Sequence, residues 1–290
     1  MSEIVVGVST GGRASLTAVR WAAQRASAVG SRLRLVHVVE GSIPSTDDAQ
    51  LLLAAQAAAR TSLEAAADTA ASVDRTLEVV TELEQGSAVD VFDRVSQGAD
   101  LLVVGSDWHG GQRASRRGVH SLRIAAGSHA PVAVIPDIDV SGRRGVVVGI
   151  DGSEASDAAL AFAVAEATRL GEPLIAVHAW DVAMMVGGDY GYGVPMVASD
   201  DLQRGAEQVL DEALAGVSSS AGSSGSSGSS LEISRVVVAG DPVIALAEAA
   251  MEASLLVVGS HGRGALARFL LGSVSHGVLA HLEGPTVVVR

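Results

Sequence analysis

A group of glycine and serine residues near the end of the chain has a spacing that suits contact with phosphate. Gly259 and Gly262 are separated by two residues, and nine further residues lead to Gly272 and Ser273, with Ser275 beyond. Glycine lets the backbone approach a ligand closely and adopt positive φ angles. The two serines fall at the start of a predicted helix over 273–283, where free backbone N–H groups and the positive end of the helix dipole favour phosphate.

An aspartate lies at the end of a second predicted strand. Asp151, followed by Gly152 and Ser153, ends a strand predicted over 145–150, and Gly259 ends one predicted over 254–259. In a doubly wound sheet the ligand crevice lies at the carboxyl ends of the strands where the winding reverses, which here are these two strands. We therefore expect Asp151 and the glycine loop to meet at one crevice.

The elements that position these residues occur twice in the chain. Asp100–Ser106 matches Ser254–Ser260 at a distance of 154 residues, and the match extends without a gap as far as Pro131 and Pro285. The beginnings of the two halves also match, so that a unit of about 140 residues is repeated. The sequence predicts two domains, residues 1–139 and 140–290.

Each half alternates short β-branched runs with longer helical patterns. In the second half, strands are predicted near 145–150, 174–179, 232–238, 254–259 and 285–289, and helices near 155–170, 200–216, 242–252 and 273–283. Continuous apolar strands suit a parallel sheet that is buried on both faces, and the alternation requires right-handed crossovers. We expect two α/β domains, each a flavodoxin-like (Rossmann-like) doubly wound sheet of five parallel strands with helices on both faces. A run of Ser and Gly over 218–230 is expected to form a surface loop.

The pattern Gly-x2-Gly-x9-Gly-Ser after a buried strand, in an α/β unit of this size, resembles that of the universal stress protein family. The resemblance covers both halves, so the chain is similar to a tandem member of that family. It implies a stress-response role, with ATP as ligand and Mg²⁺ bridging its phosphates. It also implies that Asp151 and Ala179 flank the adenine and that Gly240 lines the floor of the site. The residues that would hold the ribose and phosphates are Gly259, Gly262, Gly272, Ser273, Val274 and Ser275.

The first half departs from this pattern. The residues that stand where the second half has Asp151, Gly262 and Ser273 are Ser9, Trp108 and Val119. An indole in place of a hydrogen would fill the space that a phosphate loop needs, and the loss of the aspartate removes a fixed acceptor. We therefore expect a degenerate nucleotide site in the first domain and an intact one in the second.

Composition excludes several classes of function. The chain has no cysteine, and its 20 basic residues are all arginine, so thiolate chemistry, a Walker A loop and Schiff-base catalysis are excluded. The net charge of −13 disfavours nucleic acid as a partner. No apolar run reaches the length of a membrane span, and Met1–Val8 lacks the features of a signal peptide. We expect a cytoplasmic protein.

Three functional classes remain open. A regulatory protein, in which ATP occupancy sets conformation or partner choice, is favoured over an enzyme. A slow ATPase is the alternative. It is less favoured because phosphoryl transfer needs a cationic clamp or a water-positioning group, and only Arg263 and Arg268 lie near the loop. The third is a ligand-free structural pseudo-dimer.

The final apolar strands, 132–135 and 286–289, invite edge pairing, and the resemblance implies that the halves pair this way. Homodimerisation is also expected, whereas a protein partner is not indicated.

Two further features could suggest chemistry. Ser9–Ser15 partly resembles the Ser-Gly-Gly-x-Asp-Ser loop of ATP pyrophosphatases, but the spacing differs by one residue and the aspartate is missing, so we interpret it as a helix start. His37 and His178 occupy equivalent positions on the second strand of each half and are interpreted as structural residues.

Overall fold

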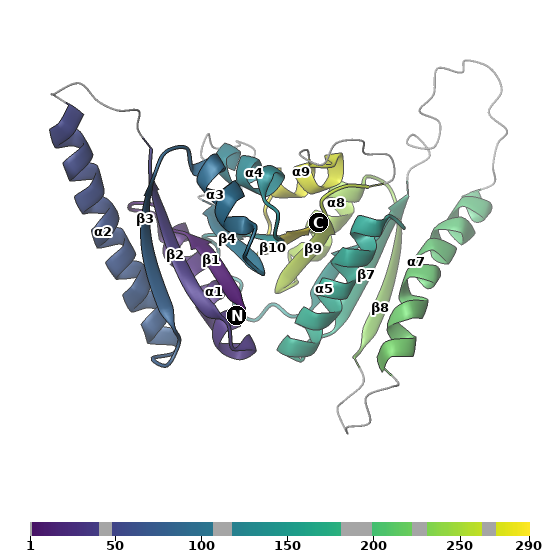
Figure 1. Cartoon of the computed structure of the whole chain (residues 1–290). Helices are drawn as coiled ribbons and strands as arrows, with labels where there is room; N and C mark the ends of the chain where they lie inside the picture. Colours follow the sequence, from purple (N-terminus) through teal and green to yellow (C-terminus); the bar gives the residue numbers. More distant parts are fainter. Residues whose placement is uncertain (1, 41–47, 107–117, 181–198, 222–230, 263–270) are drawn as a thin grey trace, which may run out of the picture. The chain divides into compact units, whose positions relative to one another are not determined.

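The computed structural model describes residues 2–40, 48–106, 118–180, 199–221, 231–262 and 271–290 (Figure 1). The backbone divides into two compact units. The first unit is built mainly from residues 1–139 and also contains Leu279–Val288, whereas the second unit is built mainly from residues 140–278. Each unit alternates strands and helices along the chain.

The first unit contains a parallel sheet in the order β3-β2-β1-β4-β5. The strands are β1 (Glu3–Gly7), β2 (Arg32–Val39), β3 (Val79–Gln85), β4 (Leu101–Ser106) and β5 (Val132–Pro136). Within this unit β10 (Thr286–Val289) pairs with β5 in the antiparallel direction. The winding reverses between β1 and β4, so the carboxyl ends of these two strands form the switch point of the sheet.

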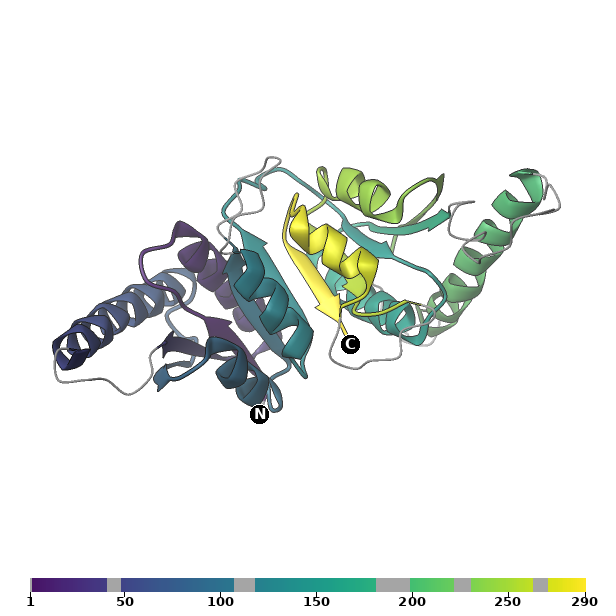
Figure 2. The same cartoon turned by 90° about the horizontal axis from the view of Figure 1, so that it is seen from above.

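Helices cover both faces of this sheet. The helices α1 (Arg13–Val29) and α2 (Asp48–Val73) pack together, and α3 (Ala88–Ser96) packs beside α4 (Gly118–Gly127) (Figures 1 and 2). Ala18, Ala22 and Ala26 of α1 are fully buried, and such small side chains let the helix lie close to the sheet. With both faces covered, Leu101 and Leu102 of β4 are fully buried, as expected for a parallel sheet.

The second unit repeats this arrangement. Its parallel strands lie in the order β9-β6-β7-β8. They are β6 (Val146–Gly149), β7 (Leu174–Trp180), β8 (Ile233–Ala239) and β9 (Leu255–Gly259). The helices are α5 (Glu154–Leu170), α7 (Ser199–Ala221), α8 (Pro242–Ala250) and α9 (Ser273–Ala280). The winding reverses between β6 and β9, which places the loops after these strands at one edge.

The α/β class, with parallel-rich sheets and helices on both faces, confirms the fold predicted from the sequence. One boundary was predicted wrongly, because α7 continues through Ala221, into the Ser and Gly run expected to be a loop from residue 218. Buried Ala206, Leu210 and Leu214 anchor α7, and extending an anchored helix by one turn is far easier than starting one. Residues 222–230 of the run lie outside the described residues.

Among the described helices, none combines the length and the apolar composition that crossing a bilayer requires.

Candidate functional site

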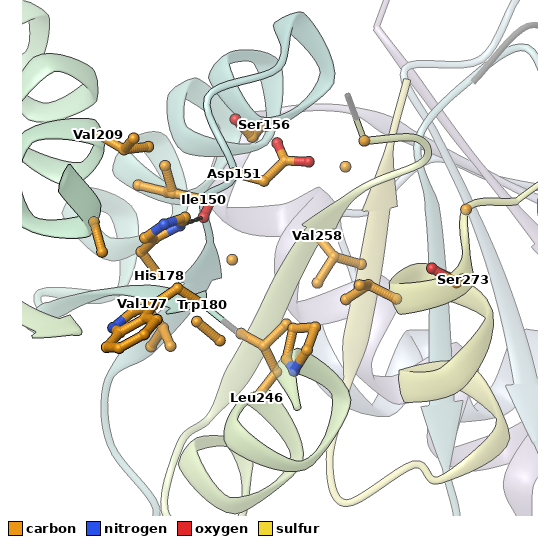
Figure 3. Close-up of a pocket in the computed structure, with 18 of the residues that line it drawn as sticks. Ile150, Asp151, Ser156, Val177, His178, Trp180, Val209, Leu246, Val258 and Ser273 are labelled. Atoms are coloured by element: carbon orange, nitrogen blue, oxygen red, sulfur yellow. Dashed lines mark hydrogen bonds between the residues drawn. The ribbon is translucent and has the colours of Figure 1, made fainter. Parts of the chain in front are cut away.

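A cavity of about 680 Å³ lies at the carboxyl ends of β6 and β9, at the switch point of the second unit (Figure 3). This volume is in the usual range for small-molecule sites. Its walls come from the ends of β6, β7 and β9 and from α7, α8 and α9. Of the residues predicted to bind a nucleotide, the cavity is lined by Asp151, Ala179, Gly259, Gly262, Gly272, Ser273, Val274 and Ser275.

Asp151 is held by the loop that starts α5. Its Oδ1 accepts hydrogen bonds from the backbone N–H of Ser153 at 3.0 Å and from the Ser153 hydroxyl at 2.6 Å. Ser153 is also the N-cap residue of α5 and forms a capping box with Ser156. The second carboxylate oxygen, Oδ2, lies against Gly262, where an added Cβ would be only 2.5 Å away. Asp151 is therefore a fixed acceptor, and it leaves no room for a side chain at Gly262.

Two other glycines of the motif have packing roles. A Cβ at Gly259 would lie 2.8 Å from the carbonyl carbon and oxygen of Ala155, in the first turn of α5. At Gly272 a Cβ would lie 3.4 Å from the Cα of His261, and the Gly272 N–H donates to the carbonyl of Ser260 at 2.7 Å. These glycines bring the starts of α5 and α9 against the end of β9.

The start of α9 faces the cavity. Ser273, Val274 and Ser275 form its first turn, whose backbone N–H groups have no acceptor within the helix. Ser275 is buried, and its hydroxyl donates to the carbonyls of Ser260 and Gly272, each at 3.1 Å. The hydroxyl of Ser275 is thus used inside the fold, whereas the exposed Ser273 lines the cavity. This helix end suits an anionic group.

The other side of the cavity is apolar. Val177, Ala179 and Trp180 of β7, Val209 of α7 and Leu246 of α8 contribute to it (Figure 3). Such a surface suits a flat aromatic ring. The sequence analysis named only Ala179 of these residues, because apolar side chains carry no chemical signature. The alternation along β7 could have indicated Val177, which lies two residues from Ala179.

Gly240 is not among the described residues that line the cavity. It follows β8 with a φ of 147°, in the left-handed region that favours glycine, and its N–H donates to the Trp180 carbonyl at 2.8 Å. The Trp180 indole N–H in turn donates to Oε1 of Gln203 on α7 at 3.1 Å. Gly240 therefore acts on the cavity through Trp180.

The charged groups of the lining are mostly acidic. Asp151 and Asp201 contribute carboxylates, and the described lining residues include no arginine. His178 also lines the cavity, and its Nδ1 lies 2.7 Å from the carbonyl oxygen of Ile150, a hydrogen bond that fixes the ring. Among the described lining residues, the group that can attract an anion is therefore the N-terminus of α9.

Comparison with known proteins places the fold. A model of the universal stress protein family matches residues 1–136 and again residues 142–290. The chain belongs to the universal stress protein family. This confirms the tandem arrangement that was predicted from the repeated glycine pattern.

Relatives of this universal stress protein match it over nearly its whole length. Universal stress protein Rv2005c of Mycobacterium tuberculosis is 34% identical over 305 residues, which cover 99% of this chain and 96% of that protein. A universal stress protein of Mycolicibacterium smegmatis is 32% identical over 300 residues, which cover 99% and 96%. Among solved structures, a universal stress protein from Archaeoglobus fulgidus has a TM-score of 0.71 at 19% identity and covers 99% of this chain and 98% of that chain. It has the same fold.

The first unit of this universal stress protein has a cavity of its own, of about 670 Å³. Ser9, Gly105 and Ser121 line it. Trp108 and the side chain of Val119 lie outside the described residues, so the expected obstruction of this site stays a prediction.

Proposed function

We propose that the second unit binds ATP, and that ATP occupancy sets the conformation of the protein or its choice of partner in the stress response. The observation that carries this proposal is that one cavity joins an apolar wall on β7 to the start of α9. The wall suits adenine, and the helix start suits phosphates. Asp151 would accept a hydrogen bond from an amino or hydroxyl group of the nucleotide.

Magnesium fits this site as an ion that arrives with the phosphates. The described residues contain no cluster of three or more Asp, Glu or His side chains that could hold a metal. Mg²⁺ is commonly bound through one or two carboxylates together with substrate phosphates. Asp151, Asp201 and the hydroxyl of Ser273 are among the oxygen ligands that the lining offers for this purpose.

A regulatory role is favoured over catalysis by the charges around the site. Phosphoryl transfer depends on cations that stabilise the transferred group. The described lining has no arginine, and the chain has no lysine. Arg263 and Arg268 lie outside the described residues. We place the protein in the cytoplasm, while pairing of the halves as a pseudo-dimer and homodimerisation remain predictions.

The test is to purify the protein without added nucleotide, denature it and identify any released ligand by chromatography and mass. We expect about one ATP per chain from the natural protein and none from Gly262→Trp, because the indole would collide with Asp151. The control is Gly216→Trp, since Gly216 is exposed on α7 with open space around its Cα, and this variant should still release ATP. If the natural protein releases nothing and fails to bind added ATP with magnesium, the proposal is wrong.

A further inference from the structure

Each unit has an outer strand at one edge of its sheet, β3 in the first unit and β8 in the second (Figure 1). The N–H of Gly240, the residue after β8, donates to the Trp180 carbonyl of β7 at 2.8 Å. Alternate residues of a strand bond to the same neighbour, so the residues of β8 that direct N–H and C=O away from β7 are Arg235, Val237 and Ala239. Among the described strands, none pairs with this side of β8. An edge of this kind is a template for a further strand.

The edge of β3 is protected by charged side chains. Glu82 accepts a hydrogen bond from Nε of Arg34 on β2 at 2.6 Å. Glu84 pairs with Arg94 on α3 at 3.0 Å. Charged side chains on an outer strand are a common protection against pairing with another chain. The first unit is therefore closed to strand addition at this edge.

The edge of β8 lacks this protection. At the distance of 154 residues that relates the two halves, Val236 and Val238 stand where β3 has Glu82 and Glu84. Both valines are half-buried. The same duplicated edge is thus charged in one unit and apolar in the other, which indicates that only β8 is suited to a partner strand.

The two valines lie on the sheet face on which α8 packs. In the strand register, Val236 is level with Val177 and Gly149, and a Cβ at Gly149 would lie 3.1 Å from the Leu246 side chain of α8. Since α8 packs on β6, β7 and β9, Val236 and Val238 remain partly accessible beside it. A strand added to β8 would cover them with its own side chains on this face, and apolar side chains fit there.

The opposite face of β8 is bordered by carboxylates of α7. Arg235 pairs with Asp211 at 2.8 Å. One helical turn away, the exposed Glu207 accepts a hydrogen bond from the Gln203 amide at 2.9 Å and has no cationic partner among the described residues. A helical turn rises about as far as two residues of a strand, and a crossover helix runs opposite to its strands, so Glu207 is level with Val237. A basic side chain on the added strand would meet this carboxylate.

We propose that the edge of β8 binds an extended segment of another protein, in which apolar side chains alternate with lysine or arginine. The backbone of the segment pairs with the outward N–H and C=O groups of β8, its apolar side chains cover Val236 and Val238, and a basic side chain faces Glu207. A second copy of this chain fits less well, because pairing β8 with β8 brings the acidic side of α7 against its own copy in a protein of net charge −13. This surface is separate from the glycine motif, and it does not depend on ATP binding.

The first experiment titrates a fluorescein-labelled heptapeptide of alternating valine and lysine with the full chain and follows fluorescence anisotropy. We expect saturable binding, whereas the same peptide with glutamate in place of lysine should not bind. Two further peptides carry backbone N-methyl groups, one on the valines and one on the lysines. Only one set of N–H groups can face β8, so one of these peptides should lose binding and the other should keep it. Equal effects of the two would contradict strand addition, and binding of the glutamate peptide would contradict the charge preference.

A proline at the edge locates the site. Val237→Pro removes an N–H that β7 does not use and should weaken binding of the lysine peptide by roughly tenfold or more. The control is Leu83→Pro, the equivalent position on β3, which should leave binding unchanged. Equal weakening by the two proline variants would show that β8 is not the site. Sedimentation should give the same mass for the natural protein and Val237→Pro, and a change from dimer to monomer would instead assign this edge to a second copy and overturn the proposal.

A charge variant leaves the sheet untouched and keeps the test decisive if a proline variant fails to fold. Glu207→Gln should weaken binding of the lysine peptide by roughly threefold. The control is Glu212→Gln on the same helix, since Glu212 is also exposed and also accepts from a glutamine amide, that of Gln208, at 2.7 Å. Both variants change the net charge equally, so equal weakening would reveal a general charge effect and would refute the site. A protein that releases ATP but binds no peptide would refute this inference alone.

Discussion

Asp151 and Gly262 constrain each other across the cavity of the second unit. Ser153 holds Oδ1 of Asp151 through two hydrogen bonds, and Oδ2 occupies the space that a side chain at position 262 would need. A carboxylate held in this way cannot swing aside without losing its bonds to Ser153. In the first half both positions differ together, since Ser9 and Trp108 stand there. The two positions therefore behave as a pair.

This pairing predicts a non-additive effect on nucleotide binding. Gly262→Ala should weaken ATP binding by roughly tenfold, because the new methyl group displaces Asp151. In an Asp151→Ser background the same change should cost much less, because the colliding oxygen is gone. Calorimetric titration of the natural protein, both single variants and the double variant gives the coupling directly. Equal losses in the two backgrounds would contradict the pairing.

A second residue-scale prediction concerns Asp74 in the first unit. Hydrogen bonds from the Ser27 hydroxyl, at 2.6 Å, and from the hydroxyl and N–H of Thr76 lower its pKa to about 2. Because the folded pKa is below the ordinary value, the stability that Asp74 contributes is present above about pH 4 and is lost as the pH falls through about 2. Ser27→Ala should raise this pKa, as followed by carboxyl ¹³C NMR. Ser62→Ala, whose hydroxyl bonds to the Ala58 carbonyl, is the control and should leave it unchanged.

At the scale of elements, the glycine motif is partly a device for packing. Gly259 allows the first turn of α5 to lie against the end of β9, and Gly105 does the same for α1 and β4, where a Cβ would lie 2.6 Å from the Ala14 carbonyl oxygen. Backbone cannot give way as a side-chain tip can. Part of the motif is therefore needed even in a unit that binds no nucleotide.

Stability measurements should show that Gly259 is needed for packing. Gly259→Ala should lower the free energy of unfolding by about 1–3 kcal/mol, because the methyl group overlaps Ala155. The same substitution at Gly216 in α7, where space is open, should instead raise it by about 0.5–1 kcal/mol through helix propensity. Urea unfolding of both variants tests the opposite signs. A Gly259→Ala protein as stable as the natural one would show that this glycine has no packing role.

The elements also show how far sequence reasoning reaches. Buried strands such as β9 and the winding order follow from apolar runs and alternation, so the α/β fold and the meeting of Asp151 with the glycine loop could be predicted. The role of Gly259 could not, because the sequence does not reveal how closely α5 approaches β9. Trp180 and Leu246 were missed because an apolar wall is recognisable only once its members are assembled.

At the scale of the whole molecule, a duplicated unit has produced two cavities of similar size with different polar groups. The second unit has a capped α5, a fixed Asp151 and the donors of α9. The first has Ser9 in place of the aspartate and an uncapped α1. The two units therefore differ in the groups that they offer to a ligand.

This difference predicts that ligands protect the units selectively. A ligand at about 100 times its dissociation constant stabilises the state that binds it by about 2.7 kcal/mol, which slows amide exchange in the elements around the site. MgATP should therefore slow hydrogen exchange in β6 and α9 and leave β1 and the start of α1 unchanged. Mass spectrometry of peptic peptides separates the two regions, and Gly262→Trp should lose the protection by MgATP. If MgATP protects both units equally, the first site is an intact nucleotide site, and Ser9, Trp108 and Val119 do not impair it.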